Sequence, residues 1–319
     1  MCPAATRPPM RIVGYIERLS CPVSIAGFSS YARGNGAAIA YAETPKTSKP
    51  MGLLMTMGRR GAGTMKVFYF TATGNGLAIA KAISGEAISI PQALKAGTTR
   101  YKDDVIGIIT PTYAGNPARI VVEFLKRVDL DADYRFAVAS YGGVMGNPIK
   151  PLASAAAAKG WSFDYTASVK MVDNYLPLFD VAAEREKKDQ GEIGEALARI
   201  AADVAARKRS VAHVGVGNAL YGAVGGLAYN KVAGPKVARE SFSVSDACIS
   251  CGVCARFCPA GNITVEEGQH PAFGDACLGC YGCAHICPHN AIHAKGEKSA
   301  ARWRNPNVTA KELLDANAQ

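Results

Sequence analysis

The pattern of apolar and polar positions changes abruptly at Met65. Upstream of it, residues 1–64 mix Pro, Gly, Ser and Met without a sustained period. Downstream, continuous apolar runs predict buried strands at 65–71, 105–110, 136–140 and 163–172. Stretches with helical spacing lie at 77–83, 118–128, 148–158 and 181–209. Buried strands that alternate with helices predict an α/β fold with a parallel sheet covered on both faces.

Two later segments follow other patterns. Residues 210–230 carry no charge, and about 20 apolar residues would be enough to cross a bilayer. Because this segment contains several glycines and the polar residues His213, Asn218 and Asn230, we expect a buried or loosely packed connector and no membrane span. Near the end, Thr309-Ala-Lys-Glu312 has the spacing of a capping box and predicts a short terminal helix.

Composition places the chain among folded proteins, since 49% of its 319 residues are hydrophobic and 19% are charged. The formal net charge of +10 is distributed unevenly. The basic excess lies largely in residues 1–64, whereas 241–300 contains more acidic than basic residues. A nucleic-acid-binding module carries its positive charge on the binding surface. We therefore expect no nucleic-acid partner.

Eight of the ten cysteines lie between Cys248 and Cys287. A disulfide framework would normally span a small secreted chain with a signal peptide. No such apolar signal is present, because Glu17 and Arg18 interrupt the only candidate run in the first residues. The clustered cysteines therefore indicate metal binding in a reducing compartment, and we expect a cytoplasmic location.

The cysteine spacing C-x2-C-x2-C-x3-C-P occurs twice and is that of bacterial ferredoxins with [4Fe–4S] clusters. Three thiolates on one loop bind the same cluster, and the fourth cysteine of each motif binds the other cluster. One predicted ligand set is Cys248, Cys251, Cys254 and Cys287, and the second is Cys258, Cys277, Cys280 and Cys283. Paired zinc sites are the alternative, but zinc needs neither the third cysteine nor the repeated unit. We interpret His285, His289 and His293 as helix or surface residues, because cysteines fill all eight ligand positions.

A glycine-containing turn, Thr71-Ala-Thr-Gly-Asn-Gly76, lies between the first predicted strand and its helix. Free backbone N–H groups and the helix N-terminus make such a turn suitable for an anion. Two further loops, 110–117 and 140–147, follow later strands and carry Tyr113 and Tyr141 beside small residues. Open α/β sheets bind ligands at this edge, so the loops indicate a site for a flat ring.

On these residues the segment 65–176 resembles the flavodoxin family, whose phosphate loop reads Thr-x-Thr-Gly-Asn-Thr. The resemblance implies a doubly wound parallel sheet that binds FMN at three loops. The implied FMN-binding residues are Thr71, Thr73, Gly74, Asn75, Gly76, Thr112, Tyr113, Ala114, Gly115, Ser140, Tyr141, Gly142 and Gly143. Gly76 stands where the family usually has a hydroxyl residue, which removes one phosphate contact.

Residues 65–319 as a whole resemble flavodoxin-domain proteins fused to bacterial-type 2[4Fe–4S] ferredoxins. The shared features include Asp173-Asn-Tyr, the paired cysteine motifs and Arg304-Asn-Pro-Asn. This resemblance implies an α/β flavodoxin-like domain followed by a small α+β dicluster ferredoxin domain. The expected division is 1–64 as a disordered leader or misplaced start, 65–209 as the FMN domain, 210–240 as a connector, 241–300 as the ferredoxin domain and 301–319 as a tail helix.

The expected function is electron transfer between two [4Fe–4S] clusters and FMN, with redox proteins of unknown identity as partners. No nucleophile or acid–base constellation accompanies these motifs, so an oxidoreductase-type carrier is favoured over a dedicated catalyst. Two alternatives remain. The first is an iron–sulfur carrier or docking protein whose flavodoxin-like domain has lost flavin, which Gly76 favours. The second is a flavin reductase that acts on a small substrate.

Overall fold

The computed structural model describes residues 64–188, 190–232 and 240–318. These residues all lie within one compact unit, Gly58–Gln319. We expected residues 1–64 to be a disordered leader or a misplaced start, but of these residues the structure describes only Thr64. In the part of the chain that the structure describes, no helix combines the length and the apolar character needed to cross a membrane.

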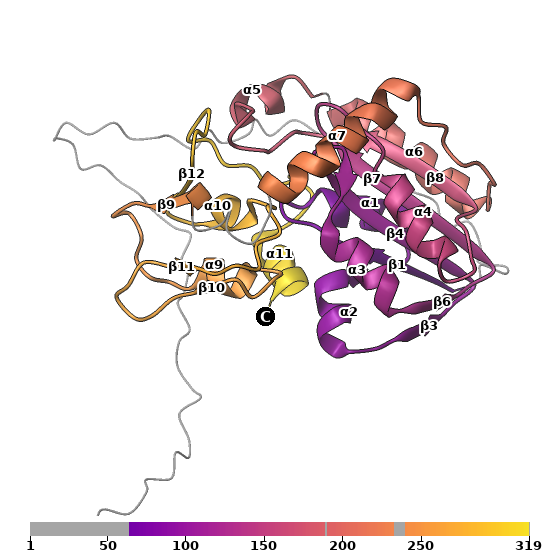
Figure 1. Ribbon diagram of the computed structural model, residues 1–319, viewed down its shortest axis with the longest axis horizontal. Coiled ribbons are helices and arrows are strands. Elements are labelled where there is room, and N and C mark those ends of the chain that lie inside the picture. Colours follow the sequence, from indigo (N-terminus) through magenta and orange to yellow (C-terminus); the bar gives the residue numbers. More distant parts are fainter. Residues whose placement is uncertain (1–63, 189, 233–239, 319) are drawn as a thin grey trace, which may run out of the picture. The chain divides into compact units, whose positions relative to one another are not determined.

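A parallel sheet forms the centre of the first part of this unit (Figure 1). Its strands lie in the order β2-β1-β4-β7-β8, and every neighbouring pair is parallel. In chain order these five strands are arranged 2-1-3-4-5, which is the doubly wound order of flavodoxin-like folds. Their bounds are β1 Met65–Tyr69, β2 Glu86–Ser89, β4 Val105–Tyr113, β7 Tyr134–Tyr141 and β8 Tyr165–Lys170. The short β5, Asn116–Pro117, pairs antiparallel with the end of β4.

Helices cover both faces of the sheet. Along β1 and the residue that follows it, apolar side chains alternate between the two faces, so both faces need cover. Val67 and Tyr69 face a core shared with α1 (Asn75–Ile83) and α6 (Gln190–Ala205). Phe68 and Phe70 face the opposite core, since successive side chains of a strand point to opposite faces. That second core is shared with α2 (Ile90–Ala96), α3 (Arg119–Arg127) and α4 (Ile149–Ala157). The covered parallel sheet expected from the sequence is confirmed.

Several elements differ from the sequence-based expectation. The helical stretch 181–209 is divided into α5 (Val181–Glu186) and α6. Strand β2 and helix α2 were not expected, because their sequence between 84 and 97 is short and mixed in character. A further small parallel pair, β3 (Arg100–Lys102) and β6 (Asp129–Asp131), lies outside the main sheet.

The second part of the unit consists of short elements around the cysteines. Two antiparallel pairs are present, β9 (Phe242–Val244) with β12 (Ile292–Ala294), and β10 (Ile263–Thr264) with β11 (Ala272–Phe273). Two five-residue helices, α9 (Val253–Phe257) and α10 (Gly282–Ile286), follow the two cysteine loops. The terminal helix α11 (Ala310–Asn317) begins with the expected capping box, in which the Glu312 N–H donates to Thr309 Oγ1 at 3.2 Å.

The connector contains a helix, α7 (Val216–Val232), whose many exposed side chains fit the loosely packed form of the expectation better than the buried one. Five of its large apolar side chains are exposed, namely Val216, Leu220, Tyr221, Val224 and Leu227, whereas Tyr229 is buried. Its inner face is glycine, because a Cβ at Gly225 would lie 2.0 Å from the Ala114 carbonyl oxygen and one at Gly222 would lie 2.9 Å from the Asn147 nitrogen. The helix thus approaches the loop after β4 so closely that only small residues fit between them.

Candidate functional site

The eight clustered cysteines surround two separate cavities. Cys248, Cys251, Cys254 and Cys287 line the first, and Cys258, Cys277, Cys280 and Cys283 line the second. The first three cysteines of each motif lie on the loop before α9 or α10 and within that helix. The fourth follows the helix and faces the other cavity, as the spacing predicts.

The donor chemistry of both cavities suits iron–sulfur clusters. Backbone N–H groups point at three of the sulfurs, from Asn262 to Cys258, from Gly279 to Cys277 and from Ala291 to Cys287, each at 3.3 Å. Such hydrogen bonds stabilise thiolates and tune cluster potentials. Burial raises the pKa of the Cys254 thiol to about 11, and it also raises the pKa values of Cys280 and Cys283. Buried thiolates therefore need a cation, which bound iron supplies.

Among the described residues, no three His, Cys, Asp or Glu side chains converge on a position for one metal ion. A cubane cluster takes its thiolates at different iron atoms, so its ligands surround a volume and not a point. The two four-cysteine cavities have this form.

A third and larger cavity, of about 410 Å³, lies at the carboxyl edge of the parallel sheet. Its volume is in the range of small-molecule and cofactor sites. Every predicted FMN-binding residue lines it except Gly74. Sequence reasoning missed further lining residues, namely Asp173, Asn174 and Tyr175 after β8, Tyr221 and Tyr229 of α7, and Cys280 and Tyr281. The signals for 173–175 were their position after a parallel strand and the Asp173-Asn-Tyr stretch shared with the resembled family.

Comparison with known proteins agrees with the cysteine geometry. Residues 247–292 match the family model described as a 4Fe-4S dicluster domain, and this range includes all eight clustered cysteines. The chain thus joins a flavodoxin-like fold to a segment that matches a 4Fe-4S dicluster domain. This combination supports an electron-transfer role.

Other comparisons add less. A solved structure, the two-electron reduced flavodoxin of Megasphaera elsdenii, is 19% identical, covers 43% of this chain and 99% of that chain, and has a TM-score of 0.25. The strand order of the sheet is what identifies the flavodoxin-like fold. No curated protein matches the chain.

The first loop of the flavodoxin-like domain is held by its own threonine. Thr71 Oγ1 accepts hydrogen bonds from the N–H groups of Gly74, at 3.0 Å, and Gly76, at 3.2 Å. Gly76 is required sterically, because a Cβ there would lie 2.2 Å from the Phe70 carbonyl oxygen. The departure from the family pattern at Gly76 thus has a packing reason, which the sequence did not reveal.

The C-terminal tail also holds this loop. The Asn305 N–H donates to the Thr73 carbonyl oxygen at 2.7 Å, and Asn305 Nδ2 donates to Asn75 Oδ1 at 3.0 Å. Asn317 Nδ2 donates to the Thr71 carbonyl oxygen at 3.1 Å. Residues 301–318 are therefore a structural part of the candidate site and more than a terminal appendage.

Two buried polar atoms in the second loop, Thr112 Oγ1 and the Tyr113 hydroxyl, have no hydrogen-bond partner among the residues that the structure describes. Buried polar groups are normally hydrogen-bonded, so each indicates a group that the protein alone does not provide. In the third loop, Gly142 leaves room for the Asp173 carboxylate, which a Cβ would approach to 2.2 Å. Asp173 accepts hydrogen bonds from the N–H groups of Gly143 and Tyr175, and burial raises its pKa. The cavity therefore fits a flat ligand with polar edges.

Helix α7 joins the flavodoxin-like domain to the ferredoxin segment through Tyr229. The Tyr229 hydroxyl donates to the Leu278 carbonyl oxygen at 3.2 Å, within the second cysteine motif. Its ring lies 6.2 Å from that of Tyr113, and the Arg119 guanidinium lies 5.1 Å from the Tyr229 ring centroid. Tyr229 thus contacts a predicted FMN loop and a cluster loop at once.

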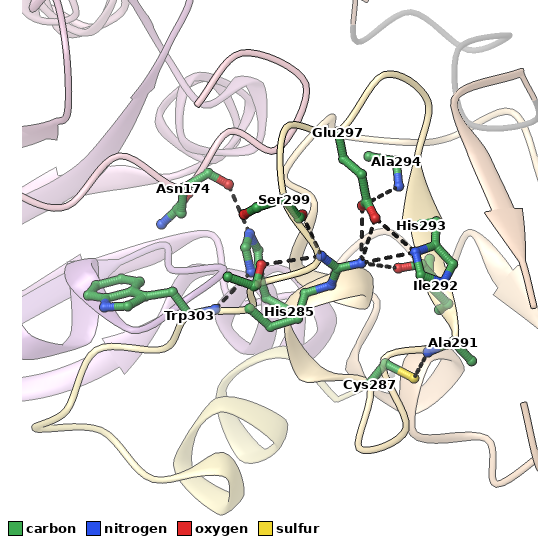
Figure 2. A network of polar contacts seen from close by, with 12 residues as sticks. Asn174, His285, Cys287, Ala291, Ile292, His293, Ala294, Glu297, Ser299 and Trp303 are labelled. Atoms are coloured by element: carbon green, nitrogen blue, oxygen red, sulfur yellow. Dashed lines mark hydrogen bonds and ion pairs between the residues drawn. The ribbon is translucent and has the colours of Figure 1, made fainter. Parts of the chain in front are cut away.

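A polar network around His285 makes a second junction (Figure 2). His285 lies on α10 and is 4% exposed, so its interpretation as an ordinary helix or surface residue was incomplete. Its Nε2 lies 2.8 Å from the Asn174 carbonyl oxygen, and the Trp303 N–H donates to its Nδ1 at 3.2 Å. His293 instead contacts Glu297 on the far side of the network, at 2.8 Å.

Proposed function

We propose that this protein transfers electrons between two [4Fe–4S] clusters and an FMN bound in the cavity of the flavodoxin-like domain. The observation that supports this proposal most directly is that the two cavities share lining residues. Cys280 and Tyr281 line both the second cysteine cavity and the loop cavity. A cluster ligand that also borders the flavin site supports direct transfer between the two centres.

The cavity residues would hold FMN by complementary means. The N–H groups of the first loop and of the N-terminus of α1 would bind the phosphate. Tyr113 and Tyr141 would pack against the ring, and the unpartnered Thr112 and Tyr113 hydroxyls would hydrogen-bond to its polar edge. Bound FMN would supply the conversion between one-electron and two-electron transfer.

The exposure of the cysteines supports an order of electron transfer through the two cysteine cavities. The first group includes the exposed Cys251, and the neighbouring Ile249 is 62% exposed. The second group has no exposed cysteine. A redox protein would therefore exchange electrons at the first cluster, and the second would connect it with the flavin site. A reducing cytoplasm, which preserves free thiols for iron binding, suits this arrangement.

The structure weakens the argument for a flavodoxin-like domain without flavin. That alternative depended on Gly76, and Gly76 has a packing reason in the contact with Phe70. No described residue group favours a small-molecule reductase over a carrier.

The first test is anaerobic purification of the full chain, with iron, sulfide and flavin assays on one sample. About eight iron, eight sulfide and one FMN per chain are expected from two cubanes and one flavin site. Full iron with no FMN bound, even after FMN is added, would remove the flavin half of the proposal.

The second test concerns the relay. A one-electron donor is mixed with the loaded protein, and the cluster and flavin absorption bands are followed separately. Replacing the second-cluster ligand Cys280→Ala should slow flavin reduction at least about tenfold, because the bordering centre is lost. Cys21→Ala, outside both motifs, is the control. Equal flavin reduction rates in Cys280→Ala and wild type would refute transfer through the second cluster.

A further inference from the structure

His285 occupies a place that the cluster chemistry does not explain. It lies on α10 between Cys283, which lines one cysteine cavity, and Cys287, which lines the other. Its ring contacts no sulfur in the network of Figure 2 and reaches instead to Asn174 and Trp303. Both of these partners lie outside the two cysteine motifs.

The hydrogen bonds fix the tautomer of His285. The Trp303 backbone N–H can only donate, so His285 Nδ1 accepts and carries no proton. The remaining ring nitrogen, Nε2, carries the proton and donates to the Asn174 carbonyl oxygen at 2.8 Å. Both ring nitrogens are therefore satisfied with one orientation of the ring.

Asn174 passes this contact on to the phosphate loop. Its Nδ2 donates to Thr73 Oγ1 at 2.6 Å, and Thr73 is 3% exposed. Asn174 and Thr73 both line the large cavity. A continuous path of hydrogen bonds thus leads from the cluster helix α10 through Asn174 to the Thr73 hydroxyl.

We propose that His285 is a positioning residue for the flavin site: it fixes Asn174, which in turn holds the Thr73 hydroxyl and the phosphate loop in the form that binds FMN. The proposal rests on the proposed function, because it concerns the affinity of that same site. By thermodynamic linkage, a contact that the ferredoxin segment makes only with the ordered loop raises FMN affinity. The ferredoxin segment therefore contributes to flavin retention as well as to electron transfer.

A matched pair of amides separates this role from simple packing. Gln at position 285 places its amide near Nε2 and can still donate to the Asn174 carbonyl oxygen. Asn at position 285 places its oxygen near Nδ1 and can still accept from Trp303, but it cannot reach Asn174. A purely structural histidine would make the two replacements similar in effect, since each loses one hydrogen bond.

The experiment measures the FMN dissociation constant of the full, cluster-loaded chain by quenching of flavin fluorescence, with iron content determined on each sample. We expect His285→Asn to weaken FMN binding about tenfold, as loss of one buried hydrogen bond implies. His285→Gln should remain within about twofold of wild type. His293→Asn is the control, because the His293 ring contacts Glu297 and does not reach the cavity.

A second variant keeps the proposal testable if His285→Asn fails to load iron. Asn174→Ala removes only the side chain that contacts Thr73 and leaves the carbonyl oxygen for His285. It should weaken FMN binding about tenfold as well. Adding His285→Asn to it should cause little further loss, because both changes act on one path.

The outcomes separate the two proposals. Wild-type protein that binds no FMN would overturn the proposed function, and the positioning role with it. Wild-type binding together with unchanged affinity in His285→Asn would overturn the positioning role alone. Equal weakening in His285→Asn and His285→Gln, or additive losses in the double variant, would also overturn it, because the histidine would then act through packing.

Discussion

Gly76 gives the sharpest test of the site geometry. Family resemblance suggests that a hydroxyl residue at this position would add a phosphate contact. The structure predicts the reverse, because a Cβ at 76 would lie 2.2 Å from the Phe70 carbonyl oxygen and 3.1 Å from its carbon. Real Cβ contacts essentially never fall below 3.0 Å. The start of α1 would therefore have to move by about 0.8 Å away from a backbone atom at the end of β1.

The expected magnitude follows from two opposing effects. Overpacking a buried position costs about 1–3 kcal/mol. Replacing glycine by alanine inside a helix normally stabilises it by about 0.5–1 kcal/mol. Because the Cβ would meet a backbone oxygen, which cannot turn aside, we take the upper part of the overpacking range, about 2–3 kcal/mol. Gly76→Ala should therefore destabilise the protein by about 1–2 kcal/mol. For a domain of this size class, that corresponds to a fall in apparent Tm of roughly 2–8 °C.

The assay is anaerobic thermal unfolding of the full chain, followed by circular dichroism and paired with FMN titration. Gly194→Ala is the matched control, because Gly194 lies within α6 and a Cβ there meets nothing within 4 Å. This control should raise the apparent Tm by roughly 1–4 °C. Gly76→Ala should also weaken FMN binding, since the N–H groups of the loop and α1 move together.

The opposite result would refute the packing argument. If Gly76→Ala were as stable as wild type, the loop would have room for a side chain, and the Phe70 contact would not be what requires glycine. If Gly76→Thr also bound FMN more tightly, the family-based interpretation of a missing phosphate contact would be correct.

Three further predictions follow from single contacts. Tyr229→Phe removes the hydrogen bond to the Leu278 carbonyl oxygen and should lower the free energy of unfolding by about 0.5–1.5 kcal/mol. Amide hydrogen exchange in α7 should be faster than in wild type, and unchanged exchange would contradict the role of Tyr229 in fixing this helix. Truncation after Ala300 removes the contacts of Asn305 and Asn317 with the loop Thr71–Gly76. It should weaken FMN binding more than about tenfold while the iron content is retained. Normal FMN affinity in the truncated protein would show that this loop is ordered without the tail. The hydrogen bond and ion pair with Lys81 and the capping contacts with Thr309 lower the pKa of Glu312 to about 2. The stability that ionised Glu312 contributes is therefore present above its ordinary pKa and is lost as pH falls through the lowered value, so the Tm advantage of wild type over Glu312→Gln should be constant above about pH 5 and shrink below it. A constant Tm difference at all pH values would refute this.

Local pattern was sufficient for four strands of the sheet, β1, β4, β7 and β8, and for the cysteines. The continuous apolar run 105–110 and the alternation of Val67, Phe68 and Tyr69 between two cores follow from burial on both faces of a parallel sheet. The cysteine spacing encodes which thiols share a cavity, because the short helices α9 and α10 turn the fourth cysteine away from its own loop. These features depend on residues that are close in sequence.

Helix α7 shows where local pattern fails. Its apolar composition left burial and loose packing open. Glycines make its closest backbone contacts, because Gly225 lies directly against the Ala114 carbonyl oxygen, and several of its large side chains are exposed while Tyr229 is buried. Which side of a uniformly apolar helix packs inward is decided by that long-range contact. The same holds for Gly76, whose requirement depends on the position of the Phe70 carbonyl group.

The contacts that join the candidate sites are long-range and often involve backbone atoms, which leaves no motif to find. Asn174 meets Thr73 across 101 residues of sequence, and His285 meets the Asn174 carbonyl oxygen across 111. A backbone carbonyl accepts a hydrogen bond whatever its side chain is, so residue identity at 174 specifies only the first of these contacts. The cysteine spacing predicts only that Cys280 is a cluster ligand, although in the fold it also borders the loop cavity. The sequence thus contains each site separately, and their coupling arises only when the fold brings α10 against the carboxyl edge of the sheet.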